Sequence, residues 1–167
     1  LFSSRIDKQR GIYKFFILLF SLNSRELIQI RRKINQIYIT GYGNKSEVYN
    51  FDKFLNQNKK KVAKLKNLVK INIMSSERRY KNIFMKSDIN ISYLENQSFL
   101  NNSFPSKVFE SLLYKKIIIN YGKLPIFENF QNIINIQKFD KFEFIKAIDH
   151  IIDNRKVLKM KALKNSE

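Results

Sequence analysis

Two arginines stand five residues apart near the start of the chain, in the segment Ser4-Arg5-Ile6-Asp7-Lys8-Gln9-Arg10-Gly11. Guanidinium groups bind phosphate oxygens in a bidentate geometry and stay charged at any physiological pH. Arg10 and Gly11 directly precede a predicted helix, and backbone N–H groups at a helix start also favour anions. The segment is therefore a candidate phosphate site, and a solvated basic turn is the alternative.

A second candidate is the stretch SFPSKVFES, from Ser103 to Ser111. Pro105 is typical of a helix entry, and Ser106 can cap that helix or offer its hydroxyl and N–H group to an anion. Glu110 follows about one turn later. Its carboxylate either complements the helix dipole or accepts two hydrogen bonds from a sugar diol.

Other residue types bound the chemistry further. The segment Gly41-Tyr42-Gly43-Asn44 allows either a turn or a close backbone approach to a ligand, and the turn is the commoner case. The chain has no cysteine, no Asp-x-Asp motif and a single histidine, His150, which we expect at the surface. We therefore expect neither a cysteine nucleophile nor a metal or other cofactor.

Short β-type runs alternate with helical patterns, and these elements must position the candidate residues. The alternation predicts βαβ units and a parallel sheet. We expect an α/β, doubly wound, mostly parallel, Rossmann-like sheet of about six strands with helices on both faces. Such sheets bind ligands outside the carboxyl ends of their strands, where the candidate loops lie. The predicted strands are 1–4, 36–40, 69–74, 89–94, 116–121 and 132–136, and the predicted helices are 12–22, 24–34 (capped by Ser24), 46–66, 76–87, 106–115 and 142–152.

The composition fits one main domain with unusual charge. The chain has 167 residues and a formal net charge of +18, which favours a polyanionic partner. A coding bias is the alternative, since Ile outnumbers Val 24 to 5. Basic residues gather in 59–70 and in the tail 155–164. They suggest a nucleic-acid module or an anionic membrane surface, and a solvated charged face is the alternative. Most aromatic residues stand in apolar runs and no nucleic-acid motif is present, so nucleic acid is not expected.

Targeting signals are not visible in the sequence. The most apolar window, 12–22, is shorter than the roughly 20 residues that span a bilayer, and no signal peptide is visible. The chain begins with Leu, so we expect it to be part of a longer protein.

Read together, the loops resemble the C-terminal domain of retaining glycosyltransferases of the GT-B fold, family 4 type. That family opens this domain with a strand and GRLDxxKG, and this chain has SRIDKQRG (4–11). The family's next strand ends in GxG, as in ITGYGN (39–44). The segment 77–92 resembles the part that leads to an aDv motif, with Asp88 as the aspartate. FPSKVFESLLYKKIII (104–119) resembles the E-x7-E element, and the likeness covers 1–152.

The resemblance implies a role for each candidate residue. Arg5 and Arg10 would stabilise the donor's diphosphate leaving group, beside Gly11. Glu110 would bind the ribose hydroxyls, and Ser106 and Lys107 would face the phosphates. Residues implied at the donor sugar are Asn102 and Ser103, and those implied at the base and backbone loops are Gly41, Gly43, Met74 and Ser75.

The implied protein is a hexosyl-type retaining glycosyltransferase that moves a sugar from a nucleotide-diphosphate sugar to a glycan or lipid-linked acceptor. Residues 1–153 would form the nucleotide-sugar-binding domain and 154–167 a basic C-terminal helix or tail. The N-terminal acceptor domain would be absent from this chain, which alone would be inactive. A cytoplasmic location, peripheral on the inner face of the cytoplasmic membrane, is expected.

Departures from the family pattern support an alternative. Asn102 stands where the family has the first Glu of E-x7-E, and Ser4 replaces a Gly. Lys115 and Ile117 replace a Gly and a Pro. The alternative is a degenerate, non-catalytic glycosyltransferase-like domain.

Overall fold

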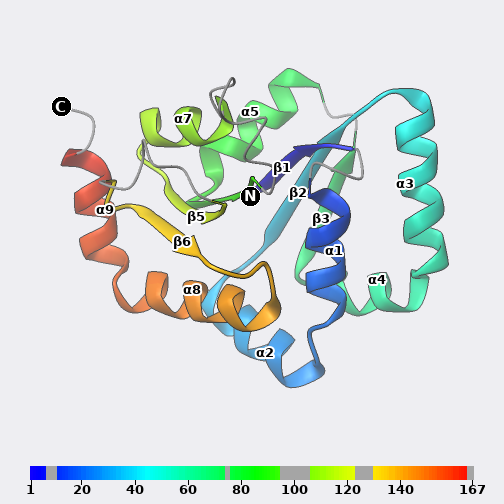
Figure 1. The fold of residues 1–167 in the computed structure, drawn as a ribbon, viewed down its shortest axis with the longest axis horizontal. Coiled ribbons are helices and arrows are strands. Elements are labelled where there is room, and N and C mark those ends of the chain that lie inside the picture. The colour runs from blue at the N-terminus through cyan, green and yellow to red at the C-terminus, as the bar shows by residue number, and fades with distance from the viewer. Residues whose placement is uncertain (7–10, 74–75, 95–105, 123–129, 165–167) are drawn as a thin grey trace. The chain divides into compact units, whose positions relative to one another are not determined.

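The computed structural model of the chain describes residues 1–6, 11–73, 76–94, 106–122 and 130–164 (Figure 1). The chain forms two compact units, Leu1–Phe84 and Met85–Glu167. Each unit carries three strands, and every strand pairing within a unit is parallel. The predicted α/β, Rossmann-like fold with about six parallel strands is therefore confirmed.

The first unit has the strand order β3-β2-β1. Ser4 of β1 lies opposite Gly41 of β2, which in turn lies opposite Ile73 of β3. The carboxyl ends of the three strands therefore share one edge. The elements are β1 (Phe2–Arg5), α1 (Ile12–Phe20), α2 (Ser24–Lys33), β2 (Ile37–Tyr42), α3 (Lys45–Gln57), α4 (Lys59–Leu65), β3 (Val69–Ile73) and α5 (Glu77–Lys86), which ends in the second unit.

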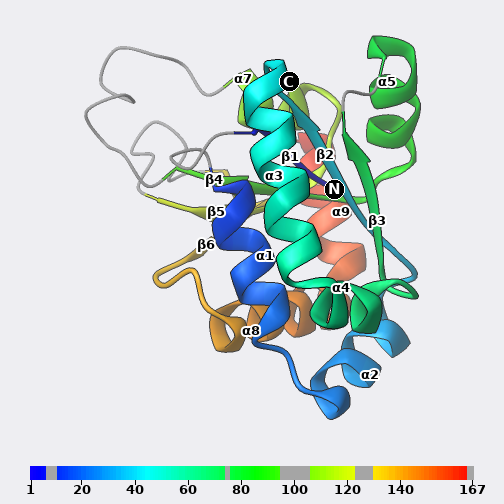
Figure 2. The same cartoon turned by 90° about the vertical axis from the view of Figure 1, so that its right-hand side faces the viewer.

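The second unit has the strand order β4-β5-β6. Figures 1 and 2 both show α7 on one side of these strands and α8 on the other. The helix α9 packs against α8 and β5, so the predicted basic tail is a helix attached to this unit. The elements are β4 (Ile89–Tyr93), α7 (Ser106–Leu113), β5 (Ile117–Tyr121), β6 (Ile133–Ile136), α8 (Lys141–Asp153) and α9 (Arg155–Lys164).

Aromatic rings form much of the core of the first unit. Phe2 of β1 stacks on Phe15 of α1 with ring centroids 4.5 Å apart. On another side of α1, Phe16 packs against Phe51 and Phe54 of α3. Because α1 meets the strand on one side and α3 on another, it is apolar almost all round. Phe2, Phe15, Phe16 and Phe51 are buried, as the apolar runs around most of them indicate.

The core of the second unit joins α7 to the strands. Val108 of α7 is buried with Ile118 of β5 and Ile133 of β6. The run Ile117–Ile119 is buried throughout, which is typical of a central strand covered on both faces. This packing holds α7 against β5 and β6.

Three local predictions are wrong. The cap of α2 is Asn23, not Ser24, and it forms a reciprocal capping box with Glu26. The predicted helix 46–66 is two helices, which meet at Asn58. The glycine turn predicted after Thr40 begins later, because Gly41 and Tyr42 continue β2.

Candidate functional site

Arg5 is the last residue of β1 and lies at the carboxyl edge of the first unit. Its side chain is 50% exposed, and its Nη2 lies 3.6 Å from Oε1 of Glu47 in the first turn of α3. The guanidinium is thus held beside the edge while half of it remains open to solvent. Arg10, the second predicted phosphate ligand, lies outside the described residues.

Gly11 begins α1 at the same edge. Its φ is 84°, in the left-handed region that favours glycine, and its carbonyl accepts the first helical hydrogen bond, from Phe15 N. The residue is buried, so the chain enters α1 through a sharp bend. This geometry explains why glycine stands at position 11, and its contact with a donor stays a prediction.

Gly41 and Gly43 are both explained by close packing. A Cβ on Gly41 would lie 2.7 Å from Cγ1 of Ile6 and 3.0 Å from Cδ1 of Ile73. A Cβ on Gly43 would lie 2.7 Å from Oε2 of Glu47. A larger residue at either position would require these neighbouring side chains to shift. The predicted base contacts of these glycines stay predictions, and Met74 and Ser75 lie outside the described residues.

In the second unit, Ser106, Lys107 and Glu110 stand together at the start of α7. Ser106 is the first helical residue. Lys107 Nζ lies 3.1 Å from Oε2 of Glu110, and both side chains are partly exposed. The structure therefore places one cation and one carboxylate side by side where the sequence predicted phosphate and ribose contacts. Asn102 and Ser103 lie outside the described residues.

A buried polar bridge ties the start of α7 to β4. Asn90 Nδ2 donates to Ser111 Oγ at 2.7 Å, and that hydroxyl donates to the carbonyl of Lys107 at 2.6 Å. Asn90 and Ser111 are both buried, so the bridge fixes the height at which Lys107 and Glu110 stand. Neither Asn90 nor Ser111 was predicted from the sequence. Their signal was weak: a polar residue within an apolar strand and a serine four residues after Lys107.

The carboxyl ends of β5 and β6 are fixed by asparagines and a glycine. Asn120 Nδ2 donates to Oδ1 of its register partner Asn135 at 2.9 Å and to the carbonyl of Gly122 at 2.8 Å. Gly122 has φ 110°, and a Cβ there would collide with the carbonyl oxygen of Leu94 after β4. These contacts keep the strand ends in register.

Three aromatic rings close the same edge of the second unit. Tyr93 ends β4, Tyr121 ends β5 and Phe139 follows β6. Phe139 meets Tyr93 at 4.6 Å and Tyr121 at 5.4 Å between ring centroids. Because the rings contact one another, we interpret them as structural residues that stabilise this edge by packing.

Asp88 lies at the opposite end of β4, just before its first residue. It accepts from Lys159 Nζ at 2.9 Å and from Arg155 Nη2 at 3.1 Å, both on α9. The hydrogen bond from Lys159 is the main cause that lowers the pKa of Asp88, and burial opposes it. Burial lowers the pKa of nearby Lys116, and Asp88 opposes that shift. Asp88 thus anchors α9, away from the carboxyl edge.

Among the described residues, no three His, Cys, Asp or Glu side chains gather as metal ligands would. His150 is exposed on α8, as predicted. None of the helices in this part of the chain has the length and apolar character needed to cross a membrane.

The fold is shared with several solved glycosyltransferases. The C-terminal domain of LpcC, a glycosyl transferase group 1 family protein of Francisella tularensis, matches with a TM-score of 0.67 and 17% identity, over 99% of this chain and 81% of that one. Anabaena HepE, solved with UDP, matches with a TM-score of 0.68 and 12% identity. The catalytic domain of Arabidopsis thaliana starch synthase IV, solved with ADP and acarbose, matches with a TM-score of 0.61 and 15% identity.

The chain covers 42% of the HepE chain and 34% of the starch synthase chain, so it corresponds to one part of those longer proteins. No protein-family model matches the sequence, and no curated protein matches it. These comparisons define the class of fold: the chain has the fold of the C-terminal domain of GT-B glycosyltransferases.

Proposed function

We propose that the chain is the donor-binding half of a glycosyltransferase that moves a sugar from a nucleotide-diphosphate sugar to a glycan or lipid-linked acceptor. The observation that supports it most is Arg5, a half-exposed cation at the carboxyl edge of a fold shared with nucleotide-bound glycosyltransferases. Fold alone does not define function, so the proposal depends on the residues at this edge.

The proposed chemistry is stabilisation of a leaving group. When the bond between the sugar's anomeric carbon and the diphosphate breaks, negative charge develops on the diphosphate oxygen. Arg5 and Arg10 in the first unit would favour that charge, and Gly11 would let the backbone approach. In the second unit, Ser106 and Lys107 at the start of α7 would offer an N–H group, a hydroxyl and an ammonium group to phosphate.

The remaining assignments follow the resemblance. Glu110 would accept hydrogen bonds from the ribose hydroxyls, and Asn102 and Ser103 would contact the donor sugar. The loops at Gly41, Gly43, Met74 and Ser75 would lie near the base. We also propose that the enzyme is of the family 4 type and transfers a hexosyl group with retention of configuration. We propose that this transfer needs no metal and that the protein is cytoplasmic.

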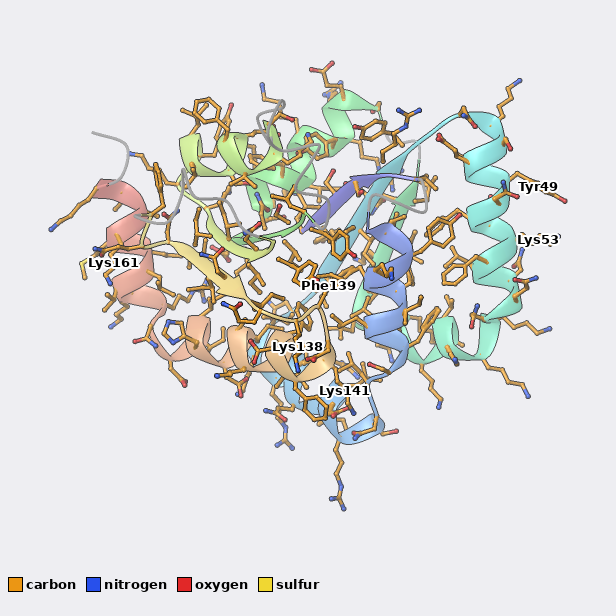
Figure 3. The ribbon with its side chains drawn as sticks, viewed as in Figure 1. Tyr49, Lys53, Lys138, Phe139, Lys141 and Lys161 are labelled. Atoms are coloured by element: carbon orange, nitrogen blue, oxygen red, sulfur yellow. The ribbon has the colours of Figure 1, made fainter. Side chains whose placement is uncertain are left out.

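Calorimetric titration of the 167-residue chain with UDP, ADP and GDP tests this function. At least one nucleotide should bind, while the chain alone should transfer no sugar. Arg5→Ala and Arg10→Ala should each weaken binding about tenfold, since each removes a charge-assisted hydrogen bond. Lys53→Ala is the control, because Lys53 points outward from α3 (Figure 3). The proposal fails if the folded chain binds none of the three, or if the control loses as much affinity.

A non-catalytic variant of this domain remains the second candidate. It is favoured by Asn102, which places an uncharged amide where the family has a carboxylate. Such a domain would still bind the nucleotide but would not support transfer. Transfer assays on the full-length natural protein and on its Asn102→Glu variant separate the catalytic from the non-catalytic candidate. Activity of the natural protein excludes the non-catalytic candidate.

A further inference from the structure

The outward side of α9 combines apolar and cationic side chains. Leu158 and Ala162 turn into the second unit and are buried. On the outer side Val157, Met160 and Leu163 are 44%, 56% and 53% exposed. A surface helix normally has one apolar side facing the core and one polar side facing water. α9 instead presents apolar side chains on both, so its outer side needs an explanation.

The rotation of α9 about its axis is fixed, so this exposure is a property of the fold. The buried pair Leu158 and Ala162 holds one side of the helix. Next to that pair, Arg155 and Lys159 both bind Asp88. Because the two basic residues are four apart, they share one side of the helix. Two adjacent constraints leave α9 a single orientation.

The outer side can therefore be read directly from the sequence. At about 100° per residue, Leu163, Lys156, Met160, Lys164 and Val157 follow one another around an arc of about 120°. We call these five residues the α9 outer face. The whole helix carries five cationic residues and no acid, and Figure 3 shows one of them, Lys161, projecting from it. On this face three apolar side chains alternate with two lysines, so its only charges are positive.

We infer that the α9 outer face binds the surface of an anionic lipid bilayer. Charge complementarity decides the partner: a second copy of the chain would bring the same cations and would be repelled. A stable protein interface buries roughly 800 Å² on each partner. Three apolar side chains are too few to cover that area. A bilayer needs no matching shape. The apolar side chains can enter the headgroup boundary while the lysine stems extend to lipid phosphates.

The surroundings of α9 favour the same partner. Lys116 faces Asp88 together with Arg155 and Lys159, so three cations surround one carboxylate there. A helix of ten residues is about 15 Å long, about half the thickness of a bilayer core, so α9 would lie on the membrane. This inference does not depend on the proposed glycosyltransferase function.

Flotation of the 167-residue chain with vesicles tests the inference. Vesicles of phosphatidylcholine alone are compared with vesicles that also contain phosphatidylglycerol. We expect binding to the anionic vesicles only. Lys156→Gln with Lys164→Gln should weaken that binding about 25-fold, since each lysine near an anionic surface contributes about fivefold. The triple change of Val157, Met160 and Leu163 to Ser should weaken it about tenfold or more.

Matched variants in the first unit separate this face from the chain's general positive charge. Lys14→Gln with Lys53→Gln removes two exposed charges, and Ile17→Ser with Ile28→Ser and Tyr49→Ser removes three exposed apolar side chains. Both should leave binding within about twofold of the wild type. The inference is overturned if these controls lose as much, if phosphatidylcholine vesicles bind equally, or if no vesicle binds. Self-association that Met160→Asp abolishes would assign the face to a second copy and also overturn it.

Discussion

In the proposed site, Glu47 and the donor's diphosphate compete for Arg5. Its Nη2 and Oε1 of Glu47 are 3.6 Å apart, which is longer than a good hydrogen bond. A half-exposed ion pair of this kind contributes only about 0–1 kcal/mol. A doubly charged diphosphate that accepts two hydrogen bonds should therefore displace it. Glu47 would hold Arg5 at the edge of the sheet until the nucleotide binds.

The change Glu47→Gln tests this competition. The other carboxylate oxygen, Oε2, accepts from Asn44 N in the capping box, and glutamine keeps that acceptor. Helix α3 should therefore keep its cap, while Arg5 loses its competing anion. We expect nucleoside diphosphate to bind about two- to fivefold more tightly, measured by calorimetry, with a melting temperature close to that of the wild type.

The control for this prediction is Asp52→Asn in the same helix. Asp52 is exposed on α3, and its replacement also removes one negative charge. Equal tightening in both variants would mean that only the overall charge matters. An unchanged or weaker affinity in Glu47→Gln would show that Glu47 does not compete for Arg5.

At the scale of elements, most strands and helices were predictable because burial leaves a periodic pattern. The exceptions were decided by contacts distant in sequence. Gly41 looked like the start of a turn, yet it continues β2 because it pairs with β1 and β3 at once and lies against Ile6 and Ile73. Local propensity favours a turn at glycine, and the neighbouring strands override it. The cap at Asn23 was missed because Ser24 has the same capping chemistry.

The contact of Asp88 with Lys159, which anchors α9, could not be predicted from the sequence because the two residues are 71 positions apart. Their contact gives a test by pH. The pKa of Asp88 is lowered on folding, chiefly by Lys159. A lowered carboxyl pKa stabilises the fold above the unfolded pKa, and this contribution disappears as the pH falls through the folded pKa.

We therefore expect Asp88→Asn to be less stable than the wild type at pH 7 by about 0.5–1 kcal/mol, since these exposed pairs are screened by solvent. The difference should shrink below about pH 4 and vanish once Asp88 is protonated. Urea unfolding at several pH values measures it. Asp52→Asn shows how much comes from losing any negative charge on this cationic chain. A difference independent of pH, or one equal to the control, would contradict the anchor.

For the whole molecule, the fold could be predicted from the sequence more completely than the candidate site could. Alternating strands and helices were enough to predict a parallel sheet, and the structure shares its fold with GT-B domains at 17% identity or less among the three described. The site depends on few side chains and on loops. Arg5, Lys107 and Glu110 stand at strand ends and a helix start, as predicted. Asn90 and Ser111, which fix Lys107, could be found only from packing.

The central claim is that the chain binds a nucleotide-diphosphate sugar, with Glu110 of the second unit as the proposed ligand of the ribose hydroxyls. Calorimetry with the best-binding nucleoside diphosphate and its 2′,3′-dideoxy form tests this claim most directly. The wild type should prefer the ribose form about tenfold or more, because a carboxylate accepts strong hydrogen bonds from the diol.

Glu110→Ala should bind both forms equally, whereas Glu143→Ala, which removes a carboxylate from the first turn of α8, should keep the preference. A wild type that binds the two forms equally, or a Glu110→Ala variant that still prefers ribose, would contradict the account.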